Sequence, residues 1–152
     1  MKNMNKYENC LLCPRKCGIN RRTGQTGVCG VSSEIMVARA ALHYWEEPCI
    51  SGKRGSGAVF FSGCSLHCVF CQNREISDGK EGKVISKARL SDIFMELVGK
   101  GANNINLVTP GQYIPDIVWA VNDAKSRGMK LPIIYNTSGY ENVTELKSCL
   151  RA

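Results

Sequence analysis

Residues 57–71 read GAVFFSGCSLHCVFC, in which an apolar run is followed at once by three cysteines. The run Ala58–Phe61 has the length of a β-strand and no polar alternation, which indicates a strand buried on both faces. Cys64, Cys68 and Cys71 follow that strand with CxxxCxxC spacing. Since the carboxyl ends of parallel strands carry the chemistry of α/β sheets, this loop is the first candidate site.

Beyond this loop the chain alternates between helical and strand patterns. Ser86 is the expected N-cap of a helix whose apolar face is formed by Leu90, Ile93, Phe94, Leu97 and Val98. The later elements are a strand at Asn104–Thr109, a helix over Ile114–Ala124, a strand at Leu131–Tyr135 and a helix marked by Val143, Leu146 and Leu150. This β-α-β-α-β-α order predicts an α/β fold with a parallel sheet and right-handed crossovers.

Composition and charge exclude several classes of protein. The 152 residues make one domain or most of one, and the 43% hydrophobic and 22% charged fractions argue against disorder. No apolar run reaches the ~18–20 residues of a membrane span, and the N-terminus lacks an apolar signal region. We therefore expect a cytoplasmic protein without membrane contact. The Lys and Arg residues behind the net charge of +7 are scattered, which disfavours nucleic-acid binding.

Nine cysteines are the unusual feature of the composition. In a reducing compartment, closely spaced cysteines bind metal more often than they form disulfides. The three loop cysteines, Cys64, Cys68 and Cys71, can hold three irons of a [4Fe–4S] cluster and leave the fourth iron open to a substrate or cofactor. The alternative is a structural zinc knuckle, which needs a fourth ligand. His67 lies inside the loop, but we expect it to face solvent.

The N-terminal cysteines form a second group with C-x2-C-x3-C-x11-C spacing, namely Cys10, Cys13, Cys17 and Cys29. Four thiolates complete a tetrahedral shell, so a second metal site is expected, with zinc and iron–sulfur both open. The alternative is a thiol-rich loop that packs without metal. Cys49 and Cys149 lack partners at useful spacing and are expected to be free or buried thiols. Glu46 and Glu47 are expected to form a solvated pair, and the alternative is that they face the active site.

Several motifs resemble the radical S-adenosylmethionine (SAM) superfamily, in the branch similar to the pyruvate formate-lyase activating enzyme. They are the loop cysteines with Phe70 before the last one, Cys10-Leu-Leu-Cys13-Pro-Arg-Lys-Cys17-Gly18, Trp45–Pro48, Cys71-Gln72-Asn73 with Ile76-Ser77, Asn104–Pro110 and Tyr135–Tyr140. The resemblance covers the chain from Cys10 onward. It implies a [4Fe–4S] cluster whose open iron binds SAM, and a reductant such as flavodoxin or ferredoxin. It further implies reductive cleavage of SAM to a 5′-deoxyadenosyl radical, with a glycyl-radical enzyme or another protein as substrate.

The same resemblance points to the residues that would contact SAM. Many relatives carry Gly-Gly-Glu at the end of the second strand, whereas this sequence has Thr109-Pro110-Gly111-Gln112, so Thr109 or backbone carbonyls are expected to replace that contact. Asn136-Thr137-Ser138-Gly139 resembles the Asp-Thr-Asn-Gly segment of the activating enzymes, which implies hydrogen bonds from Asn136 and Ser138 to SAM. The alternative for both segments is ordinary turn chemistry at strand ends.

The expected organisation is a cysteine-rich N-terminal region, residues 1–56, packed on a core of residues 57–152. At ~30 residues per βα unit, the core has room for about three units. The radical SAM core resembles a partial (βα)6 TIM-like barrel, so we expect the N-terminal half of such a barrel in a C-terminally truncated chain.

Two functions of different classes follow from these motifs. The first is a radical SAM oxidoreductase of the activating-enzyme type. The second is a non-enzymatic metal- or cluster-binding module, or an inactive relic of such an enzyme. A cysteine-rich nucleic-acid binder is disfavoured by the scattered charge and by an aromatic content of only 7%.

Overall fold

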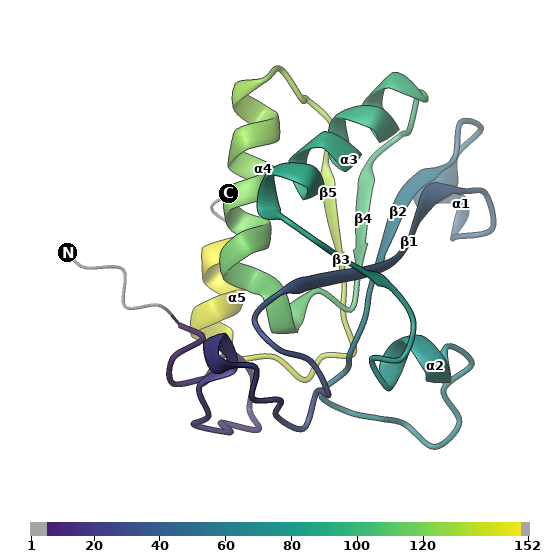
Figure 1. Cartoon of the computed structure of the whole chain (residues 1–152). Helices are drawn as coiled ribbons and strands as arrows, with labels where there is room; N and C mark the ends of the chain where they lie inside the picture. Colours follow the sequence, from purple (N-terminus) through teal and green to yellow (C-terminus); the bar gives the residue numbers. More distant parts are fainter. Residues whose placement is uncertain (1–5, 150–152) are drawn as a thin grey trace.

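A computed structural model describes residues 6–149, which form a mixed α/β fold around one sheet (Figure 1). The described strands lie in the order β3-β1-β2-β4-β5. Their bounds are β1 (Ile35–His43), β2 (Ser56–Phe61), β3 (Lys83–Ile85), β4 (Ile105–Val108) and β5 (Ile133–Asn136). The predicted α/β class is therefore confirmed.

The three strands predicted from the sequence run parallel to one another. Gly57 of β2 pairs with Ile105 of β4, and Ile105 pairs in turn with Ile133 of β5. Because a helix precedes each of β4 and β5, both parallel pairs are joined by crossover connections. Their right-handedness stays a prediction.

Two further strands make the sheet mixed and open rather than all-parallel. β1 pairs antiparallel with both β2 and β3, so the sheet extends across the predicted boundary at residue 56. The sequence does not predict β1, because the charged Arg39 interrupts its apolar pattern. In the structure, the pairing of β1 with β2 has a register shift between Val37 and Arg39. The structure therefore does not show half of a TIM-like barrel, and the division at residue 56 stays a prediction.

Two long helices cover one face of the sheet, α3 (Lys87–Gly99) and α4 (Ile114–Ser126) (Figure 1). Phe94 and Leu97 of α3 share one buried core with Val59 of β2 and Leu107 of β4. The predicted N-cap of α3 is confirmed, since the Ser86 hydroxyl accepts a hydrogen bond from the Arg89 backbone N–H at 3.1 Å.

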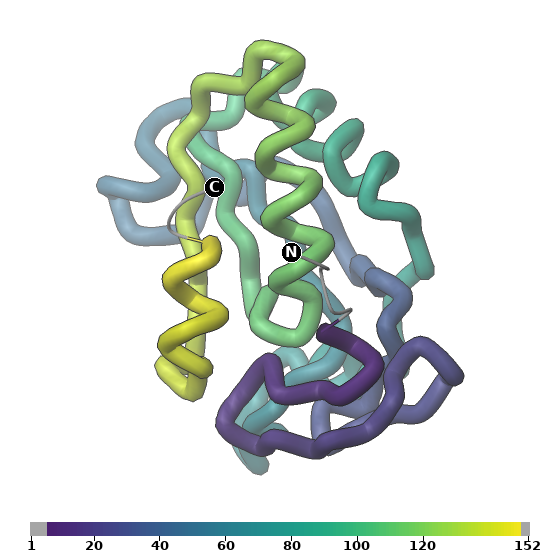
Figure 2. The backbone as a smooth tube through the Cα atoms, turned by 90° about the vertical axis from the view of Figure 1, so that its left-hand side faces the viewer, coloured from purple at the N-terminus to yellow at the C-terminus, as the bar shows by residue number. Residues whose placement is uncertain are grey.

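Shorter elements connect these layers. They are η1 (Arg21–Thr23), α1 (Pro48–Ser51), α2 (Arg74–Ser77), η2 (Gly111–Tyr113) and α5 (Val143–Cys149), which lies beside β5 (Figure 2). Leu150, predicted to belong to the last helix, lies outside the described residues. No helix in residues 6–149 is long and apolar enough to span a membrane.

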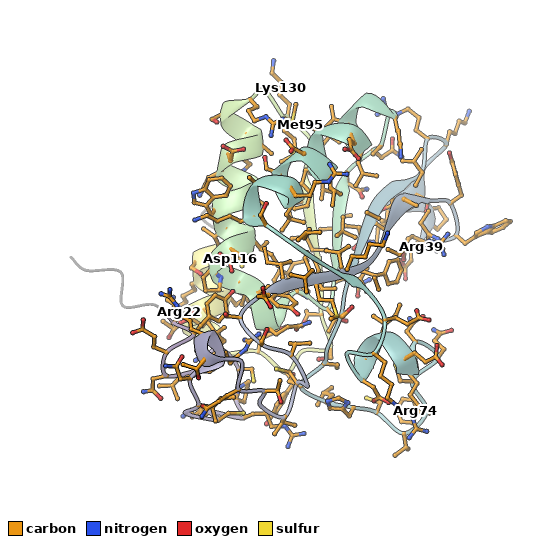
Figure 3. The ribbon with its side chains drawn as sticks, in the orientation of Figure 1. Arg22, Arg39, Arg74, Met95, Asp116 and Lys130 are labelled. Carbon is orange, nitrogen blue, oxygen red and sulfur yellow. The ribbon has the colours of Figure 1, made fainter. Side chains whose placement is uncertain are left out.

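The N-terminal segment, residues 6–31, lies at the end of the sheet where β2 and β4 finish (Figures 1 and 2). Figure 3 labels Asp116, at the start of α4, beside this segment, and the Asp116 carboxylate accepts a hydrogen bond from the Tyr7 hydroxyl at 2.7 Å. The Arg21 guanidinium donates to the Gln112 carbonyl oxygen at 2.7 Å. These contacts hold the cysteine-rich segment against the edge of the sheet that carries the loop cysteines.

Candidate functional site

The loop cysteines lie between β2 and α2, at the carboxyl end of the buried strand, and all three are partly exposed. Backbone hydrogen bonds shape the loop, since the Cys71 N–H donates to the Cys68 carbonyl at 3.0 Å. The Leu66 N–H donates to the Cys64 sulfur at 3.5 Å. Amide donors to cysteine sulfur are typical of iron–sulfur sites, where they tune the reduction potential. Three thiols on one accessible loop therefore fit a cluster with one open iron.

His67 is not the solvent-facing residue that the sequence predicts. Its Nε2 lies 2.6 Å from the Val28 carbonyl oxygen and its Nδ1 lies 3.3 Å from the Asp78 carboxylate. Both neighbours are hydrogen-bond acceptors, so the imidazole ring is held from two sides. Burial alone would raise the pKa of Asp78, but hydrogen bonds from Lys80 and His67 outweigh it and hold this pKa below its usual value. His67 thus ties the cysteine loop to the N-terminal segment.

Gly63 is a second close contact between the cysteine loop and the N-terminal segment. Its φ of +86° lies in the left-handed region, and a Cβ there would lie 2.6 Å from the Cys29 carbonyl oxygen and 2.8 Å from a Val31 methyl carbon. Only glycine lets the two backbones approach this closely.

We expect Gly63→Ala to destabilise the fold more than Gly24→Ala does. Gly24 has nearly the same φ, +84°, but nothing lies within 4 Å of its would-be Cβ, so both variants share a left-handed penalty of about 1–2 kcal/mol. Overpacking against the Cys29 carbonyl adds about 1–3 kcal/mol for Gly63→Ala alone. Urea unfolding of the two variants measures the difference, and equal midpoints would contradict the close approach.

Thr109, the residue after β4, has a strained conformation next to the loop cysteines. Its φ of +55° is an outlier for a β-branched residue, and such strain concentrates at functional sites. Thr109 lines a cavity of about 70 Å³ together with Cys64 and Cys71. It also lines a second cavity, of about 30 Å³, into which the N-terminal cysteines project. Thr109 therefore lies between the two groups of thiols.

The other two residues predicted to contact SAM differ in their placement. Ser138 lines the 30 Å³ cavity with Thr109, so the structure brings these two residues to one place. Asn136 is exposed, and its carbonyl oxygen accepts a hydrogen bond from the Thr109 N–H at 3.0 Å. Contact between SAM and these three residues stays a prediction.

The N-terminal cysteines come together although two loops contribute them. All four line the 30 Å³ cavity, whose walls also include Arg21 and Gln112. Burial raises the pKa of the Cys13 thiol, and the nearby Cys29, Cys10 and Cys17 raise it further. Within residues 6–149, no group of His, Cys, Asp and Glu side chains is already arranged as the shell of a single metal ion.

Glu46 and Asn106 form a polar contact that sequence reasoning missed. The Asn106 amide donates to the Glu46 carboxylate at 3.4 Å, so Glu46 is not half of a solvated pair. Asn106 is fully buried and its Oδ1 has no partner in the described structure. Because Ile105 and Leu107 face the core under the helices, Asn106 faces the opposite side of the sheet. A buried amide inside an apolar strand is the sequence signal that could have identified it.

Comparison with known proteins supports an iron–sulfur assignment. Residues 51–148 match the model of a family described as the 4Fe–4S single cluster domain. The chain is 28% identical over 145 residues to an uncharacterised protein of Methanocaldococcus jannaschii, which covers 91% of this chain and 41% of that protein. The chain thus spans about two fifths of the relative's length. No solved structure matches it significantly.

The matched residues include Cys64, Cys68, Cys71 and Thr109, whereas the N-terminal cysteines lie outside the match. The free thiols of Cys64, Cys68 and Cys71 are the type of ligand that a 4Fe–4S cluster takes. Because the match covers more than half of the sequence, the chain belongs to the 4Fe–4S single cluster domain family.

Proposed function

We propose that the chain is a radical SAM oxidoreductase of the activating-enzyme type. The observation that carries the proposal is the number and position of the loop thiols. Three of them follow β2, so a cluster of four irons held there keeps one iron without a protein ligand. The strained Thr109 lines the cavity beside two of these thiols.

The protein's own contribution is to hold the ligands and to position SAM. Cys64, Cys68 and Cys71 would hold the cluster, and the hydroxyls of Thr109 and Ser138 would hydrogen-bond the amino-acid end of SAM, with Asn136 beside them. When bound, the cluster and SAM would supply reductive one-electron cleavage of SAM and the hydrogen-abstracting chemistry of the 5′-deoxyadenosyl radical, with the electron coming from an external reductant such as flavodoxin or ferredoxin. The fixed turn at Thr109 spares the protein the cost of ordering it on binding.

The surface of the loop supports the proposed partners. Val69 and Phe70 are 90% and 86% exposed and lie between two of the loop cysteines. Exposed apolar side chains beside a redox site favour docking of an electron donor such as flavodoxin or ferredoxin. A glycyl-radical enzyme or another protein as substrate follows from the resemblance of the motifs.

A non-enzymatic cluster-binding module is the second candidate. The cavity beside Cys64 and Cys71 measures about 70 Å³, well below the ~300–1,000 Å³ of a typical small-molecule pocket. SAM would have to lie mostly outside this cavity, over the face of the sheet that α3 and α4 leave open.

The test is SAM cleavage by anaerobically reconstituted protein with dithionite as reductant. We expect formation of 5′-deoxyadenosine, and we expect Thr109→Val to weaken SAM binding about fivefold, because one hydrogen bond worth about 1 kcal/mol is lost while the β-branched shape is kept. Thr144→Val, on the exposed surface of α5, is the matched control. Cluster-loaded protein that neither binds nor cleaves SAM would establish the non-enzymatic module instead.

A further inference from the structure

We propose that the N-terminal segment binds a second metal centre through four thiolates, those of Cys10, Cys13, Cys17 and Cys29. This centre is separate from the cluster on the loop cysteines and does not depend on SAM chemistry. The family match begins at residue 51, so its single cluster leaves these four thiols unexplained.

The backbone of the segment brings the four thiols to one cavity. The Cys10 N–H donates to the Ile19 carbonyl at 3.0 Å, and the Gly18 N–H donates to the Cys10 carbonyl at 3.1 Å. These two bonds close a loop that carries three of the cysteines. A separate turn, in which the Gly30 N–H donates to the Gly27 carbonyl, carries Cys29 to the same cavity. Ligands from two loops are typical of structural thiolate sites.

The approach of these two loops requires a glycine. A Cβ at Gly27 would lie 2.9 Å from the Cys17 sulfur, closer than any ordinary contact. The backbone at residue 27 therefore forms one wall around that sulfur, and Figure 3 shows sulfur atoms (yellow) inside the N-terminal segment.

The charge of Arg21 is the strongest argument for a metal centre. This side chain is only 1% exposed, and it stacks against the rings of Tyr7 and Tyr113. Its described hydrogen-bond acceptors are three backbone carbonyl oxygens, of Val31, Ser32 and Gln112, and the Cys10 sulfur at 3.8 Å.

None of these acceptors is a carboxylate, and a neutral thiol does not balance a buried guanidinium. Four thiolates around a metal ion or an iron–sulfur core carry a net negative charge, which supplies the missing counter-charge. Arg21 would in turn donate to a ligand sulfur, as donors around thiolate centres commonly do. Since all four positions are filled by protein, the centre is structural rather than catalytic.

The centre would also support the cluster loop. The carbonyl oxygen of Cys29, one of the four ligands, accepts a hydrogen bond from the Cys64 N–H at 3.2 Å. Metal binding at Cys29 therefore fixes the backbone that positions the first loop cysteine. Zinc and iron–sulfur clusters can both be held by four cysteine thiolates, and the experiment below distinguishes between them.

The experiment measures zinc, iron and sulfide in purified protein in which Cys64, Cys68 and Cys71 are replaced by alanine. We expect retained metal: about one zinc per chain, or iron with matching sulfide. Replacing the four N-terminal cysteines by serine should remove that metal. The control is the pair Cys49→Ser and Cys149→Ser, because these thiols lie outside both groups and their loss should leave the metal content unchanged.

A second measurement uses the unaltered protein, since the fourfold variant could fail to fold. In native protein, alkylation followed by peptide mapping should label Cys49 readily, and a chelator should then expose the four N-terminal thiols together. Absence of metal from the variant that lacks the loop cysteines would overturn the proposal. Alkylation of the N-terminal thiols at the same rate with and without chelator would also overturn it.

Discussion

Replacing Cys64, Cys68 and Cys71 by alanine is expected to remove the [4Fe–4S] cluster completely. Reconstituted unaltered protein should hold about four irons and four sulfides at the loop. Three of these irons are each bound by one loop thiolate, so the cluster depends on all three cysteines. Without these three ligands, the loop has no side chain that holds the cluster. Iron and sulfide analysis, with the visible absorption of the thiolate-bound cluster, measures the change.

The matched control for this variant is again the pair Cys49→Ser and Cys149→Ser, which removes thiols elsewhere in the fold. The control protein should reconstitute like the unaltered one. Any metal on the N-terminal cysteines should remain in the alanine variant. The iron and sulfide contents of the variant and of the unaltered protein should therefore differ by one complete cluster. If the variant holds as much iron and sulfide as the unaltered protein, the loop cysteines are not cluster ligands, and the radical SAM proposal fails with them.

The parts of the fold that the sequence predicts are those set by local periodicity. The helix from Ser86 onward and the parallel strands β2, β4 and β5 follow from apolar residues at helical or strand spacing, and the structure confirms them. β1 is different because its apolar pattern is interrupted at Arg39 and its stability comes from pairing with β2 and β3. Pairing between distant segments leaves little trace in local spacing.

The candidate site divides in the same way. The spacing of the loop cysteines predicts their grouping, since residues 64–71 are necessarily close. The contacts that hold the loop are distant in sequence: His67 bonds the Val28 carbonyl, and Gly63 lies against Cys29. Nothing in the sequence predicts that Arg21 is buried, because its acceptors are backbone carbonyl oxygens that only the fold brings together. These residues join two segments whose proximity is a property of the whole fold.

The second large effect that we expect is a change of oligomeric state, caused by the edge of the sheet at β5. β5 pairs with β4 on one side and is the last strand of the described sheet on the other. Its residues Ile133, Ile134 and Tyr135 are only half-buried. Beside the strand, a cavity of about 260 Å³ is lined mostly by apolar side chains, including Leu107, Ile117 and Val121. An unpaired, apolar edge strand is a template for pairing with another chain.

We therefore expect the isolated chain to self-associate through β5. Full burial of an isoleucine is worth about 1.5–3 kcal/mol. Burial of a few such side chains against a second copy therefore releases an energy comparable to the whole stability of a domain, ~5–15 kcal/mol. The net charge of +7 opposes association, and added salt should therefore increase it. Size-exclusion chromatography with light scattering, over a range of protein and salt concentrations, measures the oligomeric state.

A charge on the edge strand should reverse this association. Ile134 pairs in register with the buried Asn106 and lies on the face that α3 and α4 do not cover. Ile134→Lys places a cation on the edge, which disfavours pairing with a second copy and should return the protein to a monomer. Val84→Lys makes the same change on β3, at the opposite edge, and should leave association unchanged. If the unaltered chain is monomeric at every concentration, or if both variants dissociate equally, β5 is not the surface through which copies meet.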